Sequence, residues 1–262
     1  MARPGTVFFS AADLNGLRTS KLSRSGGRRH LVEQPQAAHG WSAWSREQRE
    51  LGNRAECDRG GSGPLFRSRL SRSAPSGGNL QPWHVDVLGG EALSDLIAKV
   101  LASLASGGPR GEGTEYPVYP PKLDEPWRDR RHRVGEQLYA SIGIPREDRP
   151  ARLRQFARNY ALFGAPIGLF FSIPRSFGPP QWAHLGMFIN NVMLLAQERG
   201  LGTCPQEAWA AAYRTTGAVL GLPGDWMLYC GMALGYPDEM HPINGWRSDR
   251  EPLEAFATFK GF

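Results

Sequence analysis

The sequence has few cysteines and no long apolar segment. Its three cysteines, Cys57, Cys204 and Cys230, are odd in number and far apart, so we expect neither a disulfide framework nor a metal site. Free thiols favour a reducing compartment, and the cytoplasm is the simplest interpretation. No run of about 18 apolar residues occurs, which excludes a transmembrane helix. The apolar part of the N-terminus is shorter than a secretory signal requires, so we expect no membrane partner.

Excess basic charge is absent from most of the chain. The formal net charge of +6 raises the question of nucleic-acid binding. However, residues 1–70 contain 12 Lys and Arg against 6 Asp and Glu, whereas residues 71–262 contain 19 of each. Because the longer segment is neutral and carries no nucleic-acid-binding motif, we expect no nucleic-acid partner.

The chain divides into two segments of different composition. Residues 15–70 are rich in Arg, Ser and Gly and show no sustained period, so residues 1–70 are expected to be poorly ordered. Regular apolar spacing begins at Ser71. It predicts strands at 83–88, 167–173 and 225–235, and helices at 91–104, 128–141, 146–163, 182–199 and 209–220. Strands separated by helices are typical of an α/β or α+β domain.

The predicted helix over residues 182–199 is the most apolar of the set. A helix that is apolar on most faces must be covered on most faces. This pattern therefore indicates either a central position in the domain or a subunit interface.

The segment Ala-Pro-Ser-Gly-Gly-Asn-Leu-Gln-Pro-Trp, residues 74–83, combines backbone restriction with polar side chains. Pro75 fixes the backbone, Gly77 permits close approach to a ligand, and Ser76, Asn79 and Gln81 supply hydroxyl and amide groups. Such a loop suits a flat heterocycle with many donors and acceptors, such as a flavin. From composition alone, a polar loop that leads into a strand explains the segment equally well.

A second polar group follows the apolar helix in the segment Gly-Leu-Gly-Thr-Cys-Pro-Gln-Glu, residues 200–207. A turn ending at Pro205 is expected to expose the backbone N–H groups of Gln206 and Glu207 at the start of a new helix, where they can bind a ring nitrogen. Cys204 has no evident partner base, so a structural thiol is favoured over a nucleophile.

A third group lies near the C-terminus, where Arg247 and Arg250 follow a predicted strand and a Pro-rich turn. Guanidinium groups suit a phosphate monoester. The alternative is that both are solvated surface arginines.

Taken together in this order and spacing, the three segments resemble the FMN-dependent nitroreductase family. Residues 74–83 resemble its Ala-Pro-Ser-x-x-Asn-x-Gln-Pro-Trp signature, residues 200–207 its Gly-rich turn ending in Pro-x-Glu, and residues 235–253 its C-terminal Gly-Tyr-Pro-Asp and Arg-x-x-Arg-x-Pro-Leu sequences. The resemblance covers residues 71–262, which form the expected FMN-binding domain. It implies that the cofactor is held by Pro75, Ser76, Gly77, Asn79, Gln81, Pro205, Gln206, Glu207, Arg247 and Arg250.

The resemblance also implies an architecture. Members of the family have an α+β fold, with a mostly antiparallel sheet flanked by helices, and form interlocked homodimers with FMN at the subunit interfaces. The loop of residues 76–79 is then expected to come from one subunit and residues 205–207 from the other. The apolar helix over 182–199 is expected to pack at the dimer core.

The implied activity is an NAD(P)H-dependent ping-pong reduction of nitroaromatics, quinones or similar small electrophiles. The flavin carries the chemistry, so no catalytic side chain is required. The loop over residues 107–131, with Tyr116, Tyr119 and Trp127, is expected to decide the electron acceptor, and it is similar to that of members that reduce nitroaromatic acids. An alternative is an offshoot of the family with different flavin chemistry, such as dehalogenation or azoline oxidation.

The sequence departs from the family before residue 71. Members carry an Arg-x-Ser-x-Arg helix roughly 25 to 30 residues before the Ala-Pro-Ser loop, and its arginines and serine contact the flavin phosphate and ribityl chain. Residues 30–60 contain no counterpart. We hypothesise that residues 1–70 derive from a reading-frame error, which resequencing of the coding region tests. A further alternative is a non-catalytic relic with a damaged FMN site.

Overall fold

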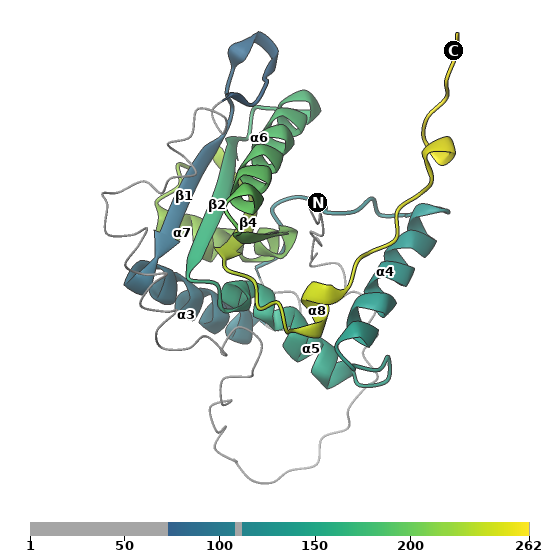
Figure 1. Cartoon of the computed structure of the whole chain (residues 1–262). Helices are drawn as coiled ribbons and strands as arrows, with labels where there is room; N and C mark the ends of the chain where they lie inside the picture. Colours follow the sequence, from purple (N-terminus) through teal and green to yellow (C-terminus); the bar gives the residue numbers. More distant parts are fainter. Residues whose placement is uncertain (1–72, 108–111, 262) are drawn as a thin grey trace.

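The computed structural model describes residues 73–107 and 112–261, and its centre is a four-stranded antiparallel sheet (Figure 1). The strand order is β1-β2-β4-β3, with every neighbouring pair antiparallel. The strands are β1 (His84–Gly89), β2 (Ile167–Pro174), β3 (Gly202–Gln206) and β4 (Trp226–Gly235). Helices flank the sheet, so the predicted α+β class is confirmed.

The two central strands are those with the longest apolar runs. In β2, six successive residues are buried, and β4 is buried over its last six residues. A strand covered on both faces has no polar face and therefore does not alternate. This explains why the apolar runs in the sequence predicted the bounds of both strands accurately.

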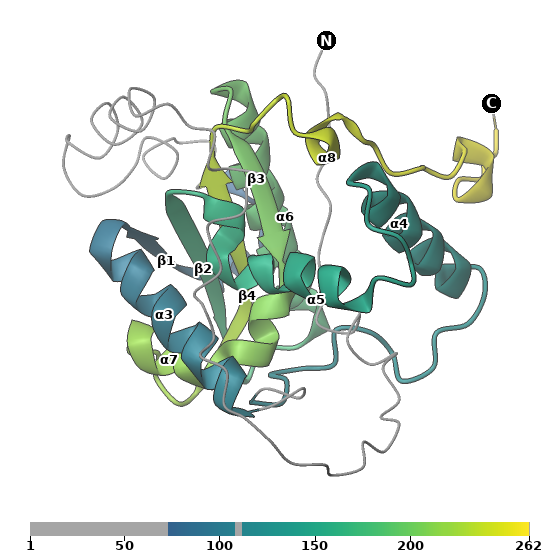
Figure 2. The ribbon, with the colours of Figure 1, turned by 90° about the horizontal axis from the view of Figure 1, so that it is seen from below.

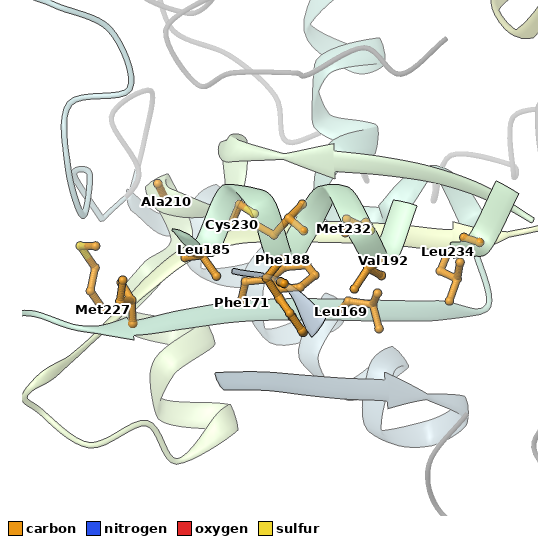
Figure 3. Packing of buried hydrophobic residues seen from close by; sticks show 14 of the residues in the cluster. Leu169, Phe171, Leu185, Phe188, Val192, Ala210, Met227, Cys230, Met232 and Leu234 are labelled. Atoms are coloured by element: carbon orange, nitrogen blue, oxygen red, sulfur yellow. The ribbon is translucent and has the colours of Figure 1, made fainter. Parts of the chain in front are cut away.

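One face of the sheet is covered by α6 (Pro179–Glu198), which runs along the strands (Figure 3). Leu169 and Phe171 of β2 and Met232 of β4 point toward Leu185 and Phe188 of the helix. The buried side of α6 also includes Ile189, Val192, Leu195 and Ala196. Of the two alternatives predicted for this helix, a central position or a subunit interface, the first is confirmed for the side that packs on the sheet.

The opposite face is covered by α3 (Gly90–Gly107), the 3-10 segments η5 (Arg158–Gly164) and η6 (Glu207–Ala212), and α7 (Tyr213–Leu220). Figure 2 shows α3 and α7 together on the side of the sheet away from α6. Trp209 is fully buried among these elements, with its ring 4.8 Å from that of Phe170. The domain thus consists of a sheet between two helical layers.

Two predicted helices are shorter than expected. The segment 146–163 forms α5 (Arg149–Ala157) followed by η5, and the positive φ values of Leu162 and Phe163, 48° and 54°, lie within η5. The segment 209–220 is likewise divided between η6 and α7. Neither boundary has a proline or glycine at the break itself, so the pattern of apolar residues continues through it.

The predicted turn at residues 200–207 is wrong over most of its length, because residues 202–206 form strand β3. Gly202 and Pro205 are unfavourable in strand interiors, and they concealed the strand in the sequence. Among the described strands, β3 lies at the sheet edge and pairs with β4 alone, a position where a residue without an N–H group is tolerated.

The C-terminal part of the chain leaves the sheet. It passes through α8 (Pro242–Gly245) and η7 (Leu253–Ala255) and runs beside α4 (Trp127–Ser141), away from the strands, in both Figures 1 and 2. Phe256 and Phe259 on this segment are 72% and 63% exposed. Among the described residues, no helix is both long enough and apolar enough to cross a membrane. The predictions for residues 1–70 lie outside the described ranges.

Candidate functional site

The 75–81 loop precedes β1 and has a closely defined backbone. The Asn79 N–H donates to the Ser76 carbonyl at 2.9 Å, and the Gln81 N–H donates to the Ser76 hydroxyl at 3.0 Å. Gly78, Asn79 and Gln81 have φ values of 61°, 56° and 47°. Positive φ is unfavourable for residues with a Cβ atom and is often found at functional sites.

This loop fits the cofactor that the sequence resemblance implies. Pro75, Gly77 and Asn79 are exposed. The Asn79 side-chain amide has no hydrogen-bond partner among the described residues. The bond that Asn79 accepts from the Gln81 side chain goes to its backbone carbonyl. A rigid, exposed loop with a free amide and small residues can approach a planar ring closely.

His184 of α6 holds this loop against the helix. The Gly77 N–H donates to His184 Nε2 at 3.3 Å. Because Nε2 accepts, the proton of the neutral ring lies on Nδ1. The Nδ1 atom is buried and has no partner among the described residues. An unpaired buried donor costs about 1–3 kcal/mol, so the histidine is unfavourable as a simple packing residue.

The 205–207 turn is positioned by buried polar groups. The Gln206 side chain is fully buried, and its Nε2 donates to the Asn159 carbonyl at 2.8 Å. Its Oε1 accepts from Trp209 Nε1 at 3.4 Å. Pro205 is buried as well. The Gln206 side chain therefore fixes the start of η6 and is not available to a ligand, while Glu207 begins η6 at the end of β3.

Glu207 is a half-buried carboxyl group with no hydrogen-bond partner among the described residues. Burial raises its pKa to about 6. The carboxyl group lies close enough to Tyr116, Tyr229 and Cys230 to contribute to the raised pKa of each of them. The group is therefore partly protonated near neutral pH, at the point where the turn meets an aromatic cluster.

We expect Glu207→Gln to stabilise the flavin-free protein at alkaline pH. An unperturbed glutamate has a pKa of about 4.3, so between roughly pH 4.3 and 6 the folded state holds more protons than the unfolded state. The free energy of unfolding therefore falls as pH rises through this window, by up to about 2 kcal/mol. Urea unfolding at pH 4 and pH 8 checks this.

At pH 8 the glutamine variant should be more stable than the wild type, and at pH 4 the two should be equal. Glu239→Gln, at an exposed position, is the control and should show no such difference. A Glu207→Gln variant that is less stable than the wild type at pH 8 contradicts the assignment.

A β-bulge creates the aromatic cluster beside Glu207. In the pairing of β2 with β4, Phe171 is opposite Cys230 and Ser172 is opposite Leu228, so Tyr229 is the extra residue. A bulge re-aims side chains and releases backbone groups from the ladder. The Tyr229 carbonyl accepts from the Tyr116 hydroxyl, and the Tyr116 and Tyr229 rings stack with centroids 5.7 Å apart.

The loop expected to decide the acceptor is divided between core and surface. Tyr116 is only 9% exposed and belongs to the core. The Tyr119 ring lies beneath the Arg131 guanidinium at 4.3 Å. Trp127 is 58% exposed at the first residue of α4. Of the three, Trp127 alone offers a large free surface within the described chain.

Carboxylates at its N-terminal end fix this loop to the domain. Glu112 accepts from the backbone N–H groups of Arg214 and Thr215 at the start of α7, at 2.7 and 3.0 Å. Glu115 pairs with Arg175. Burial raises the pKa of Glu112, but hydrogen bonds from the Thr215 and Ser103 hydroxyls, with those from the two backbone N–H groups, outweigh it and lower the pKa. The loop therefore enters the aromatic cluster at a fixed position.

Arg247 and Arg250 are both exposed on the segment that follows α8. Arg247 Nη1 donates to the Asn244 carbonyl at 2.6 Å, and Arg250 Nη1 donates to the Asp249 carbonyl at 3.0 Å. A guanidinium carries five N–H donors. Each side chain is therefore held locally and retains donors for an anion.

The described chain does not bring the three predicted groups together. The 75–81 loop lies beside the end of β2, since His84 is opposite Ser172, whereas the C-terminal segment leaves β4 beside the start of β2, where Leu234 is opposite Ile167. The eight residues of β2 span roughly 25 Å. No hydrogen bond joins the loop to the 205–207 turn or to either arginine within the described residues.

Cys204 is structural rather than reactive in its setting. Burial raises the pKa of its thiol to about 12, so the thiolate is scarce near neutral pH. Cys230 is also buried with a raised pKa. Neither cysteine forms a disulfide among the described residues.

Comparison with known proteins places these features in one family. Residues 49–236 match the profile of the Nitroreductase family. A nitrobenzene nitroreductase of Ectopseudomonas oleovorans is 36% identical over 189 residues, which cover 72% of this chain and 83% of that protein. A 4-nitrobenzoate reductase of Pseudomonas putida is 36% identical over 193 residues, covering 74% of this chain and 83% of the relative.

Solved structures show the same likeness. The FMN and NADPH-dependent nitroreductase NfnB of Sphigopyxis sp. strain HMH superposes with a TM-score of 0.73 at 45% identity, covering 80% of this chain and 94% of that one. The FMN-dependent nitroreductase NfnB of Mycobacterium smegmatis, in complex with NADPH, has a TM-score of 0.70 at 26% identity, covering 75% and 86% of the two chains.

Proposed function

This chain belongs to the nitroreductase family, and on that premise we propose that it is an FMN-dependent oxidoreductase that uses NAD(P)H to reduce nitroaromatic compounds. The observation that carries the proposal is the 36% sequence identity that this chain shares, over more than two thirds of its length, with enzymes named for nitrobenzene and 4-nitrobenzoate reduction. These names favour nitroarene reduction over the dehalogenation and azoline-oxidation alternatives.

The proposed cofactor contacts follow from the chemistry of each group. When bound, FMN would supply two-electron transfer chemistry between the nicotinamide and the acceptor. The Ser76 hydroxyl, the Asn79 amide and the backbone at Gly77 would hold its ring and ribityl chain, with Pro75 and Gln81 shaping the loop. Backbone groups at Glu207 would face the ring, with Pro205 and Gln206 fixing the turn.

The phosphate of FMN would be held by Arg247 and Arg250. Both side chains keep unused N–H donors, and arginine is suited to bidentate phosphate recognition. Neither arginine has a carboxylate partner among the described residues, so a bound phosphate would neutralise charge that no described acidic residue balances. The Arg-x-Ser-x-Arg helix that the resemblance implies has no counterpart in the sequence of residues 30–60, so no phosphate contact is assigned to it.

We propose further that the working unit is an interlocked homodimer. Three features support it. The 75–81 loop and the two arginines lie toward opposite ends of the sheet in one chain. The outer side of α6 carries Met187 and Leu194, which are 45% and 56% exposed. The C-terminal segment, with exposed Phe256 and Phe259, leaves its own domain. A second copy would cover these apolar surfaces and complete each site.

Neither Cys204 nor Cys230 forms a disulfide among the described residues, which accords with a reducing compartment, and we propose the cytoplasm. We also retain the proposal that residues 71–262 form the FMN-binding domain. The family match begins at residue 49, ahead of that boundary.

Steady-state turnover tests the proposed function. Protein loaded with FMN should oxidise NADPH or NADH in the presence of 4-nitrobenzoate, with the parallel double-reciprocal lines of a ping-pong reaction. The same protein stripped of FMN is the control and should be inactive until FMN is restored. Failure to consume any nitroarene after FMN loading contradicts the proposal.

A further inference from the structure

His184 of α6 is the one side chain outside the 75–81 loop that bonds to the loop's backbone within the described residues. Its Nε2 accepts from the Gly77 N–H, and Gly77 lies between Ser76 and Asn79, whose side chains are two of the proposed flavin ligands. A Cβ atom at Gly77 would lie 3.2 Å from His184 Cε1, so the imidazole and the loop backbone are in close contact. The helix therefore holds the loop at its centre.

We propose that His184 is a positioning residue for flavin binding, because its Nε2 fixes the orientation of the Gly77 peptide and thereby of Ser76 and Asn79. The inference rests on the proposed function. In this role the side chain acts through the loop and requires no contact of its own with the flavin or the acceptor.

The unpaired Nδ1 atom distinguishes a positioning role for His184 from that of an ordinary packing residue. When Nε2 accepts the Gly77 bond, the neutral ring must carry its proton on Nδ1, which is buried without a partner among the described residues. A leucine at this position would fill similar space on an apolar helix and remove that unpaired group. Histidine is thus favourable for the loop and unfavourable for the isolated domain.

Opposite effects on stability and on binding follow from this arrangement. His184→Leu should leave the melting temperature of the flavin-free protein unchanged or raised, because the buried unpaired donor is gone. The same variant should bind FMN about 3- to 10-fold more weakly, the effect of one hydrogen bond that orders the ligand loop. His184→Gln, which retains an acceptor, should bind FMN within about twofold of the wild type.

Titration of flavin fluorescence and thermal unfolding of the flavin-free protein measure both effects. The inference is overturned if His184→Leu binds FMN as the wild type does. It is also overturned if this variant loses melting temperature together with affinity, or if leucine and glutamine weaken binding equally. His184→Phe provides a second variant without an acceptor should the leucine variant not fold. A wild-type protein that binds no FMN overturns the proposed function itself, without reference to the variants.

Discussion

Replacement of Gly231 by alanine is expected to destabilise the protein by about 3 kcal/mol, at the upper end of the range for overpacking. A Cβ atom at this position would lie 2.4 Å from Trp209 Cδ1 and 2.7 Å from Trp209 Nε1. Trp209 is fully buried, and its ring contacts those of Phe170 and Tyr160 at 4.8 and 5.8 Å. The indole therefore has no space into which it can move without displacing its neighbours.

The same substitution should impair FMN binding. Trp209 Nε1 donates to Gln206 Oε1, so displacement of the indole also shifts Gln206 and the start of η6 at Glu207. Urea unfolding and flavin fluorescence titration measure the two effects. FMN affinity should fall together with stability, because one buried contact supports both.

Gly135→Ala is the matched control for this prediction. Gly135 lies inside α4, and a Cβ atom there would meet nothing within 4 Å. Alanine is favoured over glycine in a helix by up to about 1 kcal/mol, so this variant should be slightly more stable than the wild type. If Gly231→Ala unfolds within 1 kcal/mol of the wild type and loads FMN normally, the account of the 205–207 turn is wrong.

Introduction of negatively charged side chains on the outer side of α6 should have the largest effect on dimer assembly. Met187 and Leu194 are two helical turns apart and face away from the sheet, with Ala183 and Asn190 on the same exposed side. The double variant Met187→Asp, Leu194→Asp removes two apolar side chains from each protomer of a symmetric interface. At about 1.5 kcal/mol or more for each side chain, the dimer should weaken by about 6 kcal/mol, on the order of 10⁴-fold.

Loss of the dimer should also remove the flavin, because the proposed site draws its parts from two subunits. Sedimentation and flavin absorbance should show a folded, colourless monomer. Leu101→Asp, at a 40% exposed position of α3 on the opposite helical layer, is the control and should leave a yellow dimer. A double variant that stays dimeric, or a monomer that retains FMN, contradicts the shared site.

The sequence located the elements whose environment is uniform along their length. β2 and β4 are buried on both faces, so an unbroken apolar run marks each of them. The 75–81 loop was found because proline, glycine and amide side chains occur together in it. By contrast, β3 contains Gly202 and Pro205, which favour a turn, and its strand conformation depends on pairing with β4.

The features that the sequence did not indicate depend on contacts between distant residues. Gly77 and His184 are 107 residues apart, and a histidine in an apolar helix has no local pattern that marks its partner. The placement of Gln206 was missed for a similar reason. Its side chain is bonded to Asn159, in a segment where the expected helix breaks at positive φ. The local spacing of apolar and polar residues therefore does not indicate either contact.

Anaerobic reduction of the flavin tests the central claim most directly. Purified protein is incubated with FMN, freed of excess cofactor, and titrated with NADPH and separately with NADH while the flavin absorbance is followed. The account predicts a yellow protein that is bleached by one equivalent of a nicotinamide and regains its colour when 4-nitrobenzoate is added. A protein that retains no FMN, or a yellow protein that neither nicotinamide bleaches, contradicts it.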